Sequence, residues 1–145
     1  MNISLKNAAL VGLTLFSSGA ASASEYCKYL PEVSQNVNKG LPIQLDAWTT
    51  ITVAIADTVN CRISYHTTVS VDSLVATSNK QNGTSFTRHQ FVNHFKQETG
   101  IWVINNWNTN PEVKLLKEGN VELRYVYQDI DGRHMFQHSV GGKRE

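Results

Sequence analysis

The sequence has few of the features that mark a nucleic-acid-binding protein. Its 145 residues include two cysteines and three prolines, with 13 basic and 12 acidic side chains. Loss of the leader described below would also remove Lys6, which leaves 12 basic residues against 12 acidic ones. A chain so evenly charged lacks the clustered cations that a phosphate backbone requires. We therefore expect neither nucleic acid nor an anionic membrane surface as a partner.

Long apolar runs are also missing. The stretch over residues 8–16 has about nine residues, well short of the roughly 20 that cross a bilayer. It follows Lys6 and precedes Ala21-Ser22-Ala23, a small-x-small pattern typical of the end of a secretory signal peptide. A buried first helix is the alternative, but the Ser- and Ala-rich stretch would end it poorly. We expect residues 1–23 to be a signal peptide and residues 24–145 to form one periplasmic or secreted domain without a membrane anchor.

The two cysteines predict a disulfide. An even pair in an exported chain is usually bonded. A bond between Cys27 and Cys61 would close a loop of about 34 residues and stabilise the fold by roughly 3–4 kcal/mol. The alternative is a redox or nucleophilic thiol, which the lack of a Cys-x-x-Cys motif and the strand-like surroundings of Cys61 disfavour. We expect the bond to fix the first helix to the second strand.

The clearest helix begins in the middle of the chain. Thr87 and Gln90 form a capping box, in which each side chain satisfies a free backbone donor of the other residue. Gly100 either interrupts this helix or ends it, because glycine weakens a helix interior. Three aromatic residues follow the cap at helical spacing: Phe91, Phe95 and Trp102.

Two further helices are expected. A short one is predicted over residues 31–39, with an irregular segment before it. Another is predicted over residues 110–119, where an asparagine cap is followed by a proline at the first helical position. Residues 70–84 are mixed and polar, so we expect a connecting segment there, with a loop over residues 78–83.

Strict alternation of apolar and polar residues predicts two β-hairpins. The first joins residues 50–55 and 61–69 across the polar break at residues 57–60. The second joins residues 121–128 and 133–140, with Asp131-Gly132 as a two-residue turn. We expect one α+β domain, a four-stranded antiparallel sheet with helices packed on one face and solvent on the other.

The expected core lies between this sheet and its helices. Its members alternate along the strands or share the apolar side of a helix. Truncation of a large member would leave a destabilising cavity. The ten residues expected to be buried are Ile51, Val53, Ile55, Ile63, Tyr65, Phe91, Phe95, Leu116, Leu123 and Tyr125.

Residues suited to catalysis are scattered along the chain. His89 and His94 would lie about 140° apart around a helix axis, so they do not share a face. His134 and His138 would lie about 13 Å apart along a strand. Neither pair could hold a metal alone, and His66 could join one only through tertiary contact. No nucleophile elbow, zinc-protease motif or phosphate-binding glycine loop occurs, so we expect no metal site and no cofactor.

The tryptophans leave two interpretations open. Trp102 and Trp107 lie near the junction of the two middle helices, where they either close the end of the core or anchor a partner. Tryptophan is enriched among residues that dominate binding energy at interfaces. If the protein works by binding, we expect these two indoles to be its anchor. The expected polar rim consists of Asn105, Asn106 and Asn108.

Short motifs in the second half of the chain follow a familiar order. Asn110-Pro111-Glu112-Val113-Lys114-Leu115-Leu116-Lys117-Glu118-Gly119 is followed by Val121-Glu122-Leu123-Arg124-Tyr125 and by Asp129-x-x-Gly132. Leu41-Pro42-Ile43 precedes the first hairpin. This order resembles the small α/β pilotins of type II secretion, which implies a periplasmic domain with a four-stranded sheet. Those proteins are usually lipoproteins, and no lipobox cysteine is present here, so the resemblance implies a soluble relative that binds another exported protein.

These observations favour a non-enzymatic, exported accessory protein. Its expected partner is another exported or envelope protein, and it would assist a secretion or envelope assembly. The alternative is an immunity or inhibitor protein that neutralises a toxin or hydrolase acting in the periplasm. An enzyme whose site is assembled from scattered residues is the third hypothesis.

Overall fold

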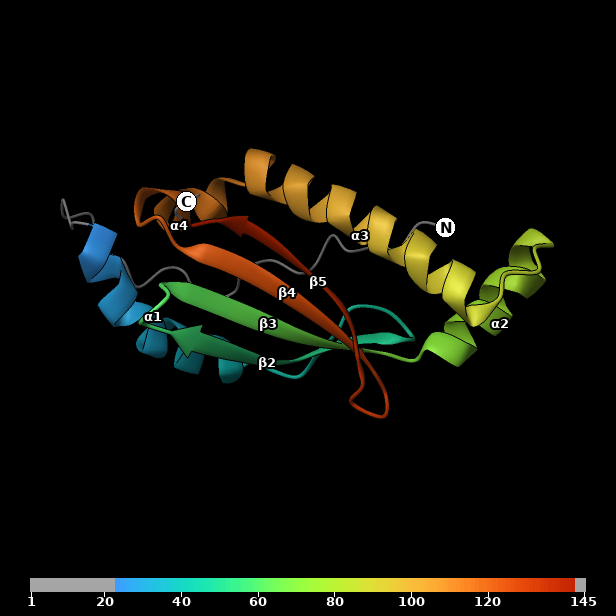
Figure 1. Ribbon diagram of the computed structural model, residues 1–145. Helices are drawn as coiled ribbons and strands as arrows, with labels where there is room; N and C mark the ends of the chain where they lie inside the picture. Colours follow the sequence, from blue (N-terminus) through green and yellow to red (C-terminus); the bar gives the residue numbers. More distant parts are fainter. Residues whose placement is uncertain (1–22, 143–145) are drawn as a thin grey trace.

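A computed structural model describes residues 23–142, which form one sheet with helices packed against it (Figure 1). The predicted signal peptide lies outside these residues apart from Ala23. No helix within the described part of the chain is long and apolar enough to cross a bilayer. The elements in chain order are α1 (Ala23–Asn38), β1 (Ile43–Gln44), β2 (Thr49–Asp57), β3 (Arg62–Val69), α2 (Val71–Asn82), α3 (Arg88–Thr109), the 3-10 turn η3 (Pro111–Val113), α4 (Lys114–Glu118), β4 (Glu122–Asp129) and β5 (His134–Gly141).

The sheet is mixed, so the expected four-stranded antiparallel sheet is wrong in strand number and in one pairing. Both predicted hairpins form, because β2 pairs with β3 and β4 with β5 in antiparallel fashion. However, β3 and β4 run parallel, with Arg62 beside Glu122. The short β1 adds a fifth strand beside β2. The chain leaves β3 through α2, α3 and α4 and returns to the end where β3 began, as a parallel pairing requires.

Helix α1 is longer than predicted. It begins at Ala23 and continues through Pro31, where the sequence predicts an irregular segment before the helix. Proline removes one backbone donor from a helix interior. Tertiary packing offsets that loss, because the apolar side of α1 is buried against the sheet. The buried residues on this side include Leu30, Val33 and Val37.

Helix α2 replaces the expected connecting segment. Val71, Leu74 and Ser78 are buried at helical spacing. Gly83 ends the helix in the left-handed conformation, with φ of 61°. Serine, threonine and asparagine favour turns because their side chains compete for backbone hydrogen bonds. The segment is therefore helical because one of its sides is buried, although its composition favours turns.

Helix α3 is continuous over 22 residues. The predicted capping box is confirmed: the Gln90 N–H donates to Thr87 Oγ1 at 3.3 Å, and the Thr87 N–H donates to Gln90 Oε1 at 3.0 Å. Gly100 does not end the helix. A Cβ at this position would lie 3.1 Å from the ring of His138, so glycine allows α3 to lie close to β5.

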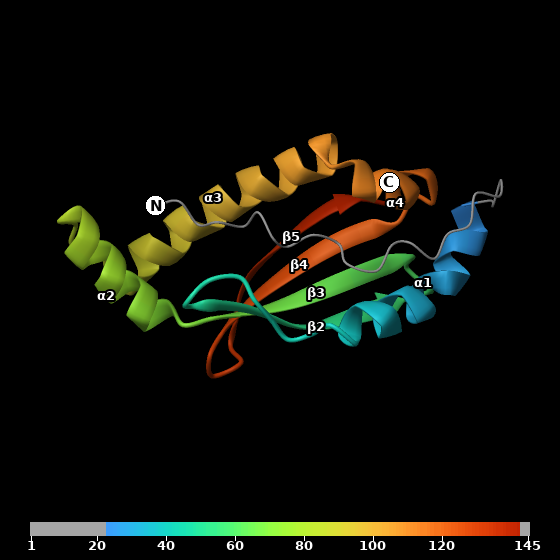
Figure 2. The same cartoon turned by 180° about the vertical axis from the view of Figure 1, so that it is seen from behind.

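The core lies on one face of the sheet. Ile63 and Tyr65 of β3 are paired with Leu123 and Tyr125 of β4, and all four are buried. Helix α1 packs beside β2 at one side of the sheet and α3 beside β5 at the other (Figure 2). The opposite face carries polar, partly exposed side chains such as Arg124. The prediction of one apolar face and one wet face is confirmed.

A β-bulge changes the expected core at β2. Eight of the ten predicted core residues are buried, but Val53 is only half-buried and Ile55 is 48% exposed. The register with β3 shifts between Ile51 and Val53. The extra residue moves the following side chains to the opposite face. Ala54 consequently faces the core in place of Ile55.

Candidate functional site

The disulfide is present, as predicted from the cysteine count. Cys27 and Cys61 have Cα atoms 4.9 Å apart and close a 34-residue loop. Cys61 lies in the β2–β3 turn rather than inside a strand, and its φ of 51° is left-handed, a conformation uncommon for residues other than glycine. Asp57 accepts a hydrogen bond from the N–H of Asn60 in the same turn at 3.0 Å. The bond therefore ties α1 to a tightly structured turn.

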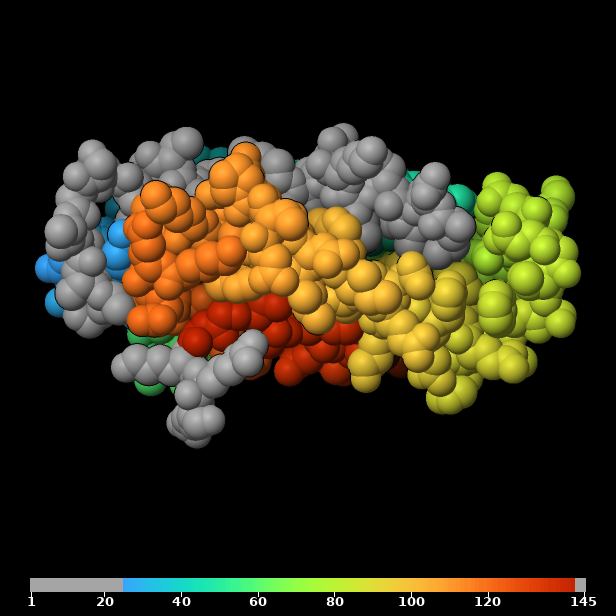
Figure 3. Space-filling model, turned by 90° about the horizontal axis from the view of Figure 1, so that it is seen from above, coloured from blue at the N-terminus to red at the C-terminus, as the bar shows by residue number. Residues whose placement is uncertain are grey.

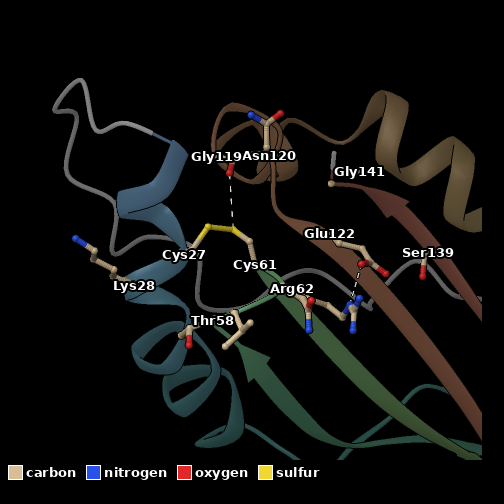
Figure 4. A pocket seen from close by; sticks show the side chains of 13 residues that line it. Cys27, Lys28, Thr58, Cys61, Arg62, Gly119, Asn120, Glu122, Ser139 and Gly141 are labelled. Carbon is tan, nitrogen blue, oxygen red and sulfur yellow. Dashed lines mark hydrogen bonds and ion pairs between the residues drawn. A yellow bond between two sulfur atoms is a disulfide. The ribbon is translucent and has the colours of Figure 1, made fainter. Parts of the chain in front are cut away.

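An open hollow of about 830 Å³ borders the disulfide at this end of the sheet (Figure 4). Its walls come from α1, the β2–β3 turn, the connection from α4 to β4 and the end of β5. Polar side chains and glycine backbone make up much of the lining, so the hollow is better suited to a polar group than to an apolar one. The lining includes Lys28, Asn60, Arg62, Asn120, Glu122 and Gly141.

Two charged groups of the hollow, Arg62 and Glu122, are paired with each other. Arg62 Nε lies 2.8 Å from Glu122 Oε2, and Arg124 Nη2 lies 2.8 Å from Glu122 Oε1. Burial disfavours the ionised Glu122, but hydrogen bonds from both arginines and from Ser139 outweigh it and lower the pKa of this carboxyl. A carboxylate held ionised in this way is poorly suited to act as a general acid at neutral pH. The pair of Arg62 with Glu122 joins β3 to β4, and the pair of Arg124 with Glu122 lies within β4.

The predicted binding residues do not form a single exposed patch. The Trp102 ring packs edge-on against Tyr125, with centroids 5.7 Å apart. Trp107 covers Gly141, where a Cβ would come within 2.6 Å of the indole. The two indoles are half-buried and lie about 140° apart around α3. Half-buried Asn106 accepts a hydrogen bond from Asn110 at 3.2 Å. Two members of the predicted set are exposed: Asn105 and Asn108.

Two isoleucines are the exposed apolar residues of this helix segment. Ile101 and Ile104 are 57% and 56% exposed. At about 100° per residue, both lie on the outward side of α3 with Asn108. Neither isoleucine is among the binding residues predicted from the sequence, which are tryptophans and asparagines. Their positions opposite buried Phe95 and Val103 were the signal that could have identified them.

His138 of β5 packs against α3. Thr99 Oγ1 of α3 lies 3.0 Å from His138 Nε2 of β5. Burial lowers the pKa of His138 and that of His66. Among residues 23–142, no group of three histidine, cysteine, aspartate or glutamate side chains is placed to hold a metal ion. The arrangement thus places His138 in the packing between α3 and β5.

Solved structures share this fold. No known protein-family profile matches the sequence, and no curated protein is significantly similar to it. A "putative secreted protein" of Pseudomonas aeruginosa superposes with a TM-score of 0.60 at 12% identity, covering 85% of this chain and 96% of that one. The pilotin of the Vibrio vulnificus type 2 secretion system superposes with a TM-score of 0.58 at 10% identity, covering 83% and 94%. The resemblance noted in the sequence is confirmed at the level of the fold.

Proposed function

We propose that this chain is an exported accessory protein that binds another exported or envelope protein, as part of a secretion or envelope assembly. The observation that carries the proposal is the shared fold with the Vibrio vulnificus secretion pilotin over 83% of this chain. The signal-peptide pattern of residues 1–23 and the bond between Cys27 and Cys61 support export to an oxidising compartment.

The state of the charged groups also supports a binding role. Glu122 is engaged by Arg62 and Arg124, both at 2.8 Å. Side chains paired in this way stabilise the arrangement of the strands and are poorly suited to proton transfer. The proposed activity is therefore recognition of a protein surface without chemical change.

The outward side of the carboxy-terminal half of α3 is the proposed contact surface. Ile101 and Ile104 supply exposed apolar area, which gains free energy when a partner removes it from water. Asn105 and Asn108 supply a polar rim beside them. Trp102 and Trp107 flank this surface and contribute through their exposed edges.

A capture experiment with matched variants tests the proposal. The tagged full chain is expressed in the organism that encodes it, cross-linked in the cells, purified and analysed by mass spectrometry. The double variant Ile101→Asp/Ile104→Asp charges the proposed surface. Ile130→Asp is the control, because Ile130 is 67% exposed in the distant β4–β5 turn. We expect a secretion or envelope protein to be recovered with the wild type and the control and lost with the double variant.

Other outcomes would contradict the proposal. Recovery of a single toxin or hydrolase would instead support the immunity or inhibitor hypothesis. Equal recovery by the double variant would place the contact elsewhere on the molecule. No recovered protein with any variant would contradict a binding role.

A further inference from the structure

Strand β5 forms one edge of the sheet. The strand order is β1-β2-β3-β4-β5, so β5 has a strand neighbour on one side only. The Gly142 N–H donates to the Val121 carbonyl at 3.2 Å. Hydrogen-bonded pairs alternate along an antiparallel ladder. Counting back from Gly142, every second residue of β5 therefore directs its backbone N–H and carbonyl toward β4. The outward-directed residues between them are Gln137, Ser139 and Gly141. Within residues 23–142, their outward backbone groups have no hydrogen-bond partner.

This edge lacks the usual protection against pairing. Natural edge strands often carry a charge or a proline that discourages a further strand. The sequence of β5, HMFQHSVG, contains no proline and no lysine, arginine, aspartate or glutamate. In Figure 3, β5 (red) is uncovered beside α3 (yellow to orange). An eight-residue strand of this kind can accept another strand from an extended peptide.

The flank of α3 above this edge offers further contacts. Gly100 lies over His138, and Trp107 lies over Gly141, so these two positions of α3 face β5. Ile104 is within about 60° of both positions around the helix axis and is 56% exposed. A strand added beside β5 would therefore bring one of its side chains close to Ile104.

The same flank carries one positive charge. Lys96 lies one turn before Gly100 and is exposed. Burial is the main cause that lowers the pKa of His138; a hydrogen bond with the Lys96 backbone raises this pKa, and the positive charge of Lys96 lowers it. An acidic side chain on an added strand would complement this lysine.

An extended segment fits the edge more readily than a second copy of this chain. Helix α3 covers β5, and a Cβ at Gly100 would lie 3.1 Å from the His138 ring. Two copies joined edge to edge by a two-fold axis would bring their α3 helices against each other on the same face of the joined sheet, where the side chains of both helices would have to share the space. An extended segment without its own covering helix meets no such crowding.

We propose that the partner donates an extended segment that adds a sixth strand beside β5. This inference rests on the proposed function and specifies how the partner is held. The segment would pair with Gln137, Ser139 and Gly141 through its backbone. It would place an apolar side chain toward Ile104 and an acidic one toward Lys96. Backbone hydrogen bonds would supply affinity and these two contacts would supply selectivity.

Two substitutions at Gln137 separate backbone from side-chain effects. Gln137→Pro removes the outward N–H, and a strand tolerates proline where its N–H faces solvent. Gln137→Ala keeps the N–H and removes only the exposed side chain. The probe is the protein recovered in the capture experiment, titrated against each full-chain variant by calorimetry. We expect Gln137→Pro to weaken binding by about tenfold or more and Gln137→Ala to bind as the wild type does.

The outcomes distinguish this inference from the proposed function. Equal binding by both variants would overturn strand addition while the binding role stands. Recovery of no protein by the wild type would overturn both. A dimer of this chain that Gln137→Pro dissociates would overturn the choice of partner. If Gln137→Pro fails to fold, amide exchange in the wild-type complex decides: unchanged exchange at Gln137, Ser139 and Gly141 would overturn the inference, and slowed exchange would support it.

Discussion

The two edges of the sheet satisfy their backbone groups differently. At the β2 edge, the Asn38 carboxamide donates to the Ala54 carbonyl and accepts from the Ala54 N–H, both at 2.8 Å. This side chain supplies the two bonds that a neighbouring strand would make, and β1 covers two further residues. At the β5 edge, Gln137 and Ser139 have no comparable partner within the described residues. One side of the sheet is closed by Asn38 and β1, and among the described residues the other side has no comparable cover.

Truncation of a core residue between the two edges should cause the largest loss of stability. Phe95 is 1% exposed and meets Tyr127 and Phe136 edge-on at 5.8 and 5.9 Å. Phe95→Ala would leave a cavity between α3 and the β4–β5 hairpin. We expect the free energy of unfolding to fall by about 3–5 kcal/mol in denaturant melts. A loss below about 1 kcal/mol would contradict the packing of α3 described here.

Loss of the disulfide should have the second-largest effect on stability and should act differently on the two edges of the sheet. It joins α1 to the β2–β3 turn, whereas β5 is held by its ladder with β4, so its loss should lower the stability of the fold more than it changes the β5 edge. We expect Cys27→Ser with Cys61→Ser to lower the free energy of unfolding by roughly 3–4 kcal/mol. Calorimetry below the melting temperature should show unchanged affinity for the captured partner. If the double variant folds but loses affinity for the partner, the disulfide and the β5 edge do not act independently, which would contradict this prediction.

Asn38 and Gln137 form a direct comparison of the two edges. Asn38→Ala would leave the N–H and carbonyl of Ala54 unpaired at a part-buried site. We expect a loss of about 1–3 kcal/mol in the free energy of unfolding. Gln137→Ala at the open edge should change stability by less than about 0.5 kcal/mol. Equal effects of the two substitutions in urea melts would show that the edges do not differ in this way.

Acidification should cause the smallest loss of stability, chiefly through His138 at the contact of α3 with β5. Burial lowers the pKa of His138 and of His66 below the ordinary value of 6.5. The unfolded chain therefore binds more protons as the pH falls below about 6.5, and stability is lost as the pH falls toward the lowered folded-state values. Thermal melts between pH 7.5 and pH 5 should show this decline. His138→Gln should reduce it, and an unchanged slope would contradict the assignment.

Local patterns predicted the parts of the fold that depend on neighbours in the sequence. The two hairpins follow from alternation, and the start of α3 follows from the capping box at Thr87 and Gln90. The bond between Cys27 and Cys61 follows from the cysteine count. Each signal lies within one segment or in the composition, so a single sequence suffices.

Tertiary contacts decided the parts that were predicted incorrectly. Helix α2 forms because Val71 and Leu74 are buried, although its composition favours turns. The bulge after Ile51 moves Ile55 out of the core without any change in the residue pattern. The parallel pairing of β3 with β4 depends on the path of the chain through three helices. The open edge at β5 could not be recognised until the strand order was known, because its residues read like those of any strand.

Amide hydrogen exchange on the free protein and on its complex with the captured partner tests the central claim most directly. In the free protein, we expect slow exchange at Ala54, whose N–H is bound by Asn38, and fast exchange at Gln137. In the complex, the amides of Gln137, Ser139 and Gly141 should become protected while that of Ala54 stays unchanged. Binding without new protection at these three amides would contradict the account.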